Sequence, residues 1–209
     1  MKAETVRIQA PIPGKGTIGI EVPNLKASLV VLREILENPR WDPQKVALPL
    51  ALGKDVGGGI ILADLSDMPH LLIAGATGSG KTVCMNSVLA GLLMSRTPQE
   101  LRLILIDPKI VEFSGYNHLP HLVVPVITEA KKVGLALRWA INEMEWRYKI
   151  FAKSGVRNIK AFNNRPLVKQ TDMFAEDMPE DEEEEKDRIP DRLPYVVIVV
   201  DELADLMMV

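Results

Sequence analysis

The sequence predicts an α/β fold built around a mainly parallel sheet, with a smaller β-rich segment in front of it. Three observations indicate this class. Two apolar runs, 101–106 and 195–200, have the length and composition of buried strands. A glycine-rich motif at 75–82 lies between a short apolar run and a helical pattern. The second buried strand ends in two consecutive carboxylates, Asp201 and Glu202.

The glycine-rich motif fits G-x-x-x-x-G-K-[ST], the phosphate-binding loop or Walker A motif of nucleoside triphosphatases. Its glycines permit backbone angles that turn successive N–H groups inward, toward an anion at the start of the next helix. Lys81 is suited to the β- and γ-phosphates and the Thr82 hydroxyl to Mg²⁺. The residues predicted to bind ATP are Gly75, Ala76, Thr77, Gly78, Ser79, Gly80, Lys81 and Thr82.

A chance glycine-rich turn is the alternative interpretation of this motif. The flanking sequence argues against it, because the motif requires a buried strand before it and a helix after it. Leu71 to Ala74 supplies the predicted strand, and Val83 to Ser95 the predicted helix.

The second strand and its two carboxylates form a candidate Walker B element. At the carboxyl edge of a sheet, Asp201 can support the Mg²⁺ held by Thr82. Glu202, one residue further, can act as the general base toward the attacking water. A strand that ends in acidic residues is a weak signal alone and a strong one with a phosphate loop about 120 residues earlier. Lys81 and Glu202 are therefore the candidate catalytic residues.

The remaining elements follow from hydrophobic periodicity and turn residues. Segments 5–12 and 17–22 are predicted to form a hairpin, and 48–52 with 60–65 a second one. Between the hairpins, 26–38 is predicted as an amphipathic helix. Its buried side would comprise Leu29, Leu32, Ile35 and Leu36.

The longest predicted helix covers 129–153. Two i,i+4 ion pairs are expected on its exposed face, Glu143 with Arg147 and Glu145 with Lys149. Trp139 and Trp146 are interpreted as packing residues in preference to a base-stacking platform. Apolar residues recur along it at helical spacing: Val133, Leu137, Ile141, Met144, Tyr148 and Phe151.

Composition excludes several classes of protein. The 209 residues are 47% hydrophobic and 25% charged, which is typical of a soluble globular chain. No apolar run approaches the roughly 18 to 20 residues of a membrane span, and no signal peptide opens the chain. The single cysteine, Cys84, excludes an internal disulfide and is interpreted as a small buried hydrophobe. A cytoplasmic location is predicted, without membrane contact from this segment.

Charge is distributed unevenly along the chain. Residues 172–191 carry 11 acidic and 2 basic side chains, which leaves 23 basic and 17 acidic residues elsewhere. The acidic stretch is predicted to be a solvated, disordered insertion loop, because it contains too little apolar surface to order itself. The mildly basic remainder is compatible with a nucleic-acid partner.

His118 and His121 form an H-x-x-H pattern. Metal ligation would need further cysteine, histidine or carboxylate ligands, and none are clustered nearby in the sequence. Both histidines, and His70, are therefore interpreted as structural, and no structural metal is predicted.

Several segments together resemble the FtsK/SpoIIIE-type bacterial DNA translocases, and the resemblance covers nearly the whole chain except the acidic insertion. In the first half it rests on 7–15, 19–24, 32–36, 52–55 and 68–72, and in the second half on 106–109, 120–122, 143–148, 156–159 and 201–208.

The resemblance implies a RecA-like P-loop NTPase that assembles as a homo-hexamer around double-stranded DNA and moves it at the division septum. By similarity, residues 75–82 bind ATP and Mg²⁺, Asp201 is the Walker B aspartate and Glu202 the catalytic glutamate. Residues 1–45 resemble the end of a smaller preceding domain, and 46–209 the first part of the motor domain. Related full-length proteins are often tethered to the inner membrane.

The resemblance also places the family's sensor strand, trans-acting arginine and most DNA-facing loops after Val209. The isolated chain is therefore expected to hold Mg·ATP without translocating DNA. Two alternatives stay open at this point. One is a nucleotide-binding module without turnover of its own, and the other is a related ring ATPase of conjugation or genome packaging.

Overall fold

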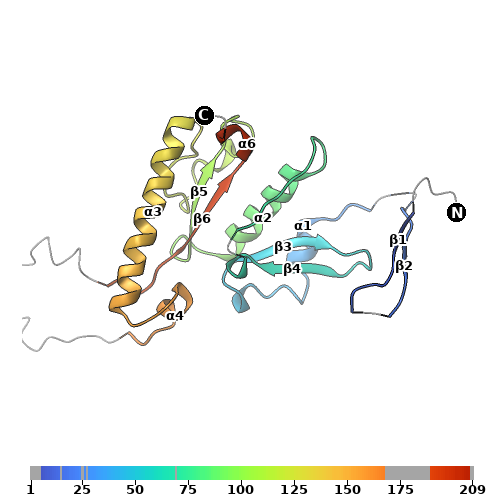
Figure 1. Cartoon of the computed structure of the whole chain (residues 1–209), viewed down its shortest axis with the longest axis horizontal. Coiled ribbons are helices and arrows are strands. Elements are labelled where there is room, and N and C mark those ends of the chain that lie inside the picture. Colours follow the sequence, from blue (N-terminus) through green and yellow to red (C-terminus); the bar gives the residue numbers. More distant parts are fainter. Residues whose placement is uncertain are drawn as a thin grey trace, which may run out of the picture. The chain divides into compact units, whose positions relative to one another are not determined.

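The computed structural model describes residues 6–14, 16–24, 26, 28–68, 70–167 and 189–207. The chain forms two compact units, Met1–Ser95 and Arg96–Val209. The prediction of a mixed α/β fold with a parallel sheet is confirmed (Figure 1). The predicted disordered insertion lies almost entirely outside the described residues.

The first unit contains two antiparallel hairpins, as predicted. β1 (Arg7–Gln9) pairs with β2 (Gly19–Glu21), and β3 (Pro49–Lys54) pairs with β4 (Ile60–Asp64). Two 3₁₀ turns flank the second hairpin, η1 (Pro43–Lys45) before it and η2 (Leu65–Asp67) after it. A small core joins this hairpin to the preceding helix; its buried members are Ile35, Ala51 and Ile60.

Asp64 fixes the base of the second hairpin. Its Oδ2 accepts a hydrogen bond from the backbone N–H of Ala47, and its Oδ1 accepts from those of Leu48 and Ser66. The carboxylate thus ties the segment entering β3 to the turn that leaves β4.

The predicted helix at 26–38 is wrong over its first half. α1 covers only Leu32–Leu36, and Val31 before it has an extended backbone. Leu29, expected on the buried side, is 85% exposed. The β-branched pair at 30–31 disfavours helical χ1 rotamers, which accounts for the late start of the helix.

The strand predicted at 71–74 is also absent. These residues have no regular secondary structure, and Leu72 is 80% exposed. A strand exists only where a partner supplies a ladder of hydrogen bonds. The two sheets of this unit are complete two-stranded hairpins and do not include the segment. After it, α2 (Lys81–Ser95) forms as predicted.

In the second unit, β5 (Leu101–Ile106) and β6 (Tyr195–Val200) are parallel and in register from Leu101↔Tyr195 to Ile106↔Val200. Parallel bridges from β5 to Leu122 and Ile127 extend the pairing on the strand's other side. β5 is therefore the central strand of this unit, and its side chains are almost all buried.

Helices and a short turn complete the second unit. α3 (Ala130–Lys153) runs alongside β5 and β6 in Figure 1, and Val133 joins the core formed by Ile104, Ile106 and Ile127. α4 (Ile159–Asn163) follows α3, and α6 (Leu203–Leu206) follows β6. A single 3₁₀ turn, η3 (Ser114–Tyr116), lies in the connection after β5.

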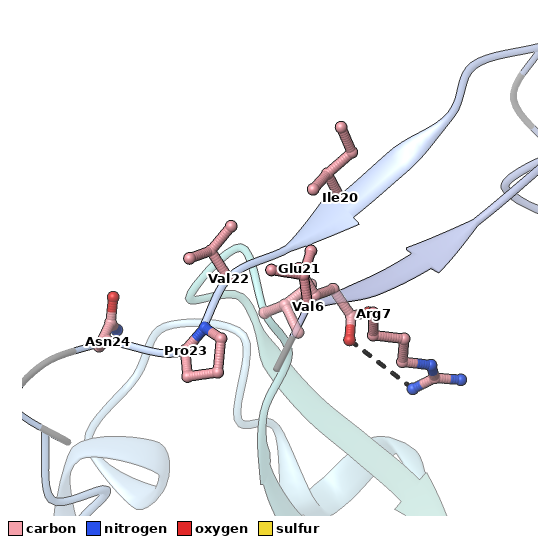
Figure 2. Close-up of a pocket in the computed structure, with 8 residues that line it drawn as sticks. Val6, Arg7, Ile20, Glu21, Val22, Pro23 and Asn24 are labelled. Atoms are coloured by element: carbon pink, nitrogen blue, oxygen red, sulfur yellow. Dashed lines mark ion pairs between the residues drawn. The ribbon is translucent and has the colours of Figure 1, made fainter. Parts of the chain in front are cut away.

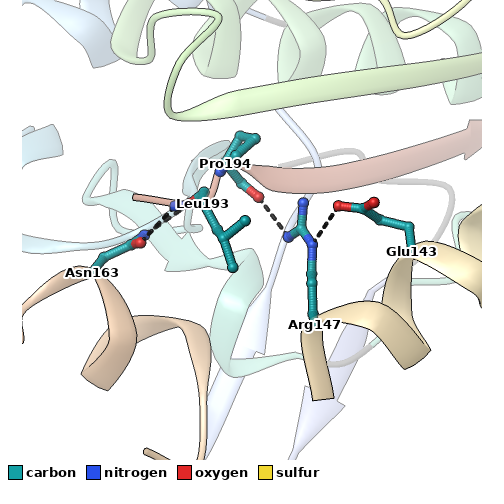
Figure 3. Close-up of polar contacts among 5 residues, drawn as sticks. All are labelled: Glu143, Arg147, Asn163, Leu193 and Pro194. Atoms are coloured by element: carbon teal, nitrogen blue, oxygen red, sulfur yellow. Dashed lines mark hydrogen bonds and ion pairs between the residues drawn. The ribbon is translucent and has the colours of Figure 1, made fainter. Parts of the chain in front are cut away.

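The ion pair between Glu143 and Arg147 forms, at 2.8 Å, although not on an exposed face. The Arg147 side chain is only 12% exposed, and its Nη1 donates to the Pro194 carbonyl at 2.7 Å (Figure 3). Asn163 exchanges two hydrogen bonds with the backbone of Leu193. Together these contacts fix the entry to β6.

The apolar residues of α3 are only partly covered within this unit. Val133 and Ile150 are buried, whereas the side chains along a neighbouring stripe are substantially exposed. Trp139 and Trp146 are each a little over one third exposed, so they contribute less to packing than predicted. The exposed stripe comprises Leu137, Ile141, Met144 and Tyr148.

Candidate functional site

The phosphate loop has the backbone that its sequence predicts. Gly78 and Gly80 have φ values of +80° and +95°, which side-chain-bearing residues rarely adopt. A Cβ at Gly75 would collide with the Ser79 side chain. The loop is closed by a hydrogen bond from the Ser79 N–H to the Ala76 carbonyl, at 2.9 Å. Steric constraints therefore explain why glycine occupies each of these three positions.

Lys81 and Thr82 are the first two residues of α2, and the Cys84 N–H donates back to the Gly80 carbonyl. The helix is anchored by buried side chains on its later turns, including Leu89 and Leu92. The first N–H groups of a helix have no partner within the helix and carry the positive end of its dipole. The motif thus presents a helix N-terminus with a lysine and a hydroxyl, which suits a polyphosphate.

The two carboxylates follow β6 as predicted. Asp201 is 4% exposed, and its N–H donates to the Ile106 carbonyl at 3.0 Å, continuing the β5–β6 ladder for one more bond. Glu202 is partly exposed and precedes α6. The strand supporting them is half-buried along its length in this unit, whereas a fully buried strand was expected.

A third carboxylate lies at the same sheet edge and was not singled out as a site residue from the sequence. Asp107 directly follows β5 and is completely buried. Its Oδ2 accepts from the N–H groups of Glu112 and Phe113, at 2.9 and 3.0 Å. Within the described residues, its Oδ1 has no hydrogen-bond partner. The signal available in the sequence was that Asp107, like Asp201, directly follows a buried parallel strand.

Lys109 is the second group that sequence reasoning missed. Its Nζ lies 3.3 Å from Asp205 Oδ2 and 3.7 Å from Glu202 Oε2. The hydrogen bond with Asp205 is the main cause that raises the pKa of Lys109; loss of solvation opposes it, and the charges of Asp205 and Glu202 add to the rise. The ammonium therefore bridges the predicted catalytic glutamate and the first turn of α6.

Backbone strain marks the same edge. Among the described residues, only Ile110 and Glu202 have positive φ without being glycine, at +59° and +56°. Such conformations cost on the order of 1–3 kcal/mol each and recur at functional sites. One follows β5 and the other follows β6, whose ends are adjacent in the sheet.

The structure places the two predicted motifs in different units. Residues 75–82 belong to the first unit, and Asp201 and Glu202 to the second. Each motif has a defined local geometry, and their joint action on one nucleotide remains a proposal.

The histidines and the cysteine considered in the sequence analysis lie in ordinary packing or surface environments. His121 is buried, and its Nε2 is 2.9 Å from the Arg96 carbonyl, so this nitrogen carries the proton. His118 is exposed and Cys84 is partly buried. In the described part of the chain, no three histidine, cysteine or carboxylate side chains gather as a metal site would require. None of the described helices combines the length and apolar character needed to cross a bilayer.

A cavity of about 620 Å³ lies between Arg7 and Glu21 of the first hairpin (Figure 2) and Val56 in the turn from β3 to β4. An ion pair of 3.7 Å joins Arg7 to Glu21 along its wall. No residue of the phosphate loop lines this cavity. It therefore carries none of the predicted nucleotide chemistry.

Comparison with known proteins identifies the family. The sequence profile of the FtsK/SpoIIIE family matches residues 31–209, and that of the FtsK alpha domain matches residues 1–24. The chain belongs to the FtsK/SpoIIIE family. The resemblance drawn from the sequence is thereby confirmed.

Curated relatives match across all 209 residues, and three of them represent the group. They are the DNA translocase FtsK of Clostridium acetobutylicum (48% identical) and two Bacillus subtilis proteins, the DNA translocases SftA (48%) and SpoIIIE (46%). The chain spans 25%, 20% and 25% of the length of these relatives, respectively.

Solved structures also share the fold, and two of them are described next. The pCW3 conjugation coupling protein TcpA, in a monomer form with ATPγS, has a TM-score of 0.58 at 24% identity, over 97% of this chain and 48% of TcpA. The cytoplasmic domain of the type VII secretion ATPase EccC from Thermomonospora curvata has a TM-score of 0.60 at 24% identity, over 87% of this chain and 22% of EccC. The fold that this chain shares with them is consistent with the RecA-like core predicted from the sequence.

Proposed function

We propose that this chain is part of an ATP-driven motor that translocates double-stranded DNA during chromosome segregation and cell division. The observation that carries the proposal is the geometry of residues 75–82, in which glycines with positive φ lead directly into helix α2. This motif lies in a chain of the FtsK/SpoIIIE family. The curated relatives named above are DNA translocases, which supports DNA as the substrate.

In the proposed site, the backbone N–H groups of 75–82 hold the phosphates of ATP, and Lys81 neutralises charge on the β- and γ-phosphates. Thr82 and Asp201 hold Mg²⁺, directly or through its waters, and the metal supplies further charge neutralisation. The hydroxyl and carboxylate oxygens fit this role, because Mg²⁺ prefers hard oxygen ligands. Glu202 takes a proton from the attacking water.

The proposed organisation follows the family. Residues 1–45 form the end of a smaller domain and its linker, which the alpha-domain match at 1–24 supports. Residues 46–209 belong to the motor domain, which assembles as a homo-hexamer around DNA in the cytoplasm. Outside 172–191, basic residues outnumber acidic ones by 23 to 17, which favours contact with the phosphate backbone.

The test is steady-state ATP hydrolysis by the full-length gene product, with and without linear duplex DNA at low salt. Hydrolysis should rise with DNA and should be lost in Lys81→Ala. The matched control is Lys132→Ala, because Lys132 pairs with Glu129 on an exposed surface at the start of α3. Hydrolysis that ignores DNA would contradict a DNA motor and would favour a related ATPase with another substrate. Binding of ATP without any hydrolysis would favour a nucleotide-binding module.

A further inference from the structure

Lys109 connects three parts of the carboxyl edge of the β5–β6 sheet. It lies in the turn after β5, and it contacts Glu202 immediately after β6 and Asp205 within α6. Both carboxylates lie within 3.7 Å of the same ammonium, so their like charges are close enough to repel each other. The ammonium of Lys109 offsets this repulsion, because it attracts both carboxylates.

The turn that carries Lys109 is held from beneath. The Asp107 carboxylate accepts hydrogen bonds from the Glu112 and Phe113 backbones, and the Ile110 N–H donates to the Asp107 carbonyl at 3.2 Å. Phe113 is completely buried, which anchors the far end of the turn. Lys109 therefore extends from a fixed backbone, and its reach to Glu202 is defined by the fold.

This ion pair is expected to contribute little to the stability of the folded protein. The Lys109, Glu202 and Asp205 side chains are 53%, 35% and 41% exposed. Ion pairs with this much solvent access contribute little to folding. In contrast, the direction of a single carboxylate matters strongly when it must meet a water molecule in line with a phosphate.

We propose that Lys109 is a positioning residue that sets the direction of the Glu202 carboxylate for its role in ATP hydrolysis. This inference rests on the proposed function, since it assumes that Glu202 is the base. In this role Lys109 acts on the reaction through its contacts with Glu202 and Asp205. Asp107 supports it by holding the turn.

The test measures hydrolysis and nucleotide binding together in the full-length gene product with duplex DNA. Lys109→Ala should lower kcat by about 10- to 100-fold, the cost expected from misplacing a catalytic group by about 1 Å. Its KM for ATP and its affinity for a fluorescent ATP analogue should stay unchanged. Lys109→Arg keeps the charge and should retain most of the turnover. Lys132→Ala, which removes another paired lysine, should behave as the parent.

A double-mutant cycle separates positioning from a general structural defect. In a Glu202→Gln background, residual turnover is followed over hours with radiolabelled ATP, and adding Lys109→Ala should lower it no further. A further drop of the same size as in the parent would overturn the proposal, as would unchanged or faster turnover in Lys109→Ala alone. If Glu202→Gln itself left turnover intact, the assignment of the base in the proposed function would fail. Loss with Glu202→Gln but not with Lys109→Ala would remove only the role of Lys109.

Discussion

The phosphate loop and the carboxyl edge of β5 and β6 present their functional groups in opposite ways. Residues 75–80 are exposed, and the loop is shaped by glycines, whose backbone angles define the proposed anion site. At the sheet edge, Asp107 and Asp201 are buried, and their N–H groups donate to the carbonyls of Ile127 and Ile106, which are distant in the sequence. The first site depends on local backbone freedom, and the second depends on tertiary contacts.

This difference predicts where substitutions act. Changes in the phosphate loop should weaken nucleotide binding and leave folding nearly intact, because its groups are exposed. Changes at the sheet edge should divide into two kinds. Those at the partly exposed Glu202 should affect turnover, and those at the buried Asp107 should affect stability.

The largest effect is expected for Glu202→Gln in the full-length gene product. Turnover should fall by about 10² to 10⁴-fold, the usual contribution of a general base, with ATP binding retained. Steady-state hydrolysis and isothermal titration calorimetry with ATP measure the two quantities. Hydrolysis at the parent rate would exclude Glu202 as the base.

Asp107→Ala should be the most destabilising change at the sheet edge. Two backbone donors, those of Glu112 and Phe113, would lose a buried charged acceptor. At about 1.5 kcal/mol each, the free energy of unfolding should fall by about 3 kcal/mol. Urea denaturation measures it, and Asp107→Asn is the control that keeps an acceptor oxygen. Equal stability of all three proteins would mean that the turn is held by other contacts.

Lys81→Ala should weaken binding of Mg·ATP by roughly 10- to 100-fold, because a charge-assisted contact to phosphate contributes about 1.5–3 kcal/mol. The midpoint of urea denaturation without nucleotide should stay unchanged. This outcome would sharpen the contrast with Asp107, since one position would affect binding alone and the other stability. Parent-like affinity in calorimetry would refute the phosphate-loop assignment.

Asp64 offers a matching test at a partly buried carboxylate, within the unit that contains residues 75–82. Asp64→Ala removes the acceptor for three backbone N–H groups and should cost about 2 kcal/mol in the free energy of unfolding. Burial tends to raise the pKa of Asp64, but hydrogen bonds from Ser66, Leu48 and Ala47 outweigh it and hold the pKa below its ordinary value.

Because the folded-state pKa of Asp64 is the lower one, its stabilisation is present above the unfolded pKa of about 3.9 and is lost as pH falls through the folded value. The stability difference between parent and Asp64→Asn should therefore shrink below about pH 4. A constant difference from pH 7 to pH 2.5 would contradict this role of the carboxylate.

The smallest effect is expected for Gly78→Ala. No atom lies within 4 Å of the added Cβ, so the cost comes only from the positive φ of +80°. That cost is about 1 kcal/mol for an alanine. The melting temperature should fall by a few degrees at most, and Gly91→Ala, inside α2 with ordinary φ, should not lower it. A larger loss at Gly78 would indicate contacts beyond its backbone angle.

Local patterns in the sequence were sufficient for the backbone of the 75–82 loop, both hairpins, α2, α3 and the two strands of the parallel sheet. Each of these has a period, a turn or a glycine requirement that acts over a few residues. The sequence also predicted that Asp201 and Glu202 follow a strand. The ion pair between Glu143 and Arg147 followed from i,i+4 spacing alone.

Only the tertiary structure decided the rest. The helix predicted from Lys26 begins at Leu32, and residues 71–74 form no strand, because packing and strand partners override periodicity in short segments. Arg147 is mostly covered because the chain entering β6 passes beside it, a contact across 47 residues. The reach of Lys109 to Glu202 likewise depends on the register of two strands separated by more than 80 residues. Such contacts have no local period, so the sequence contains the residues but not their proximity.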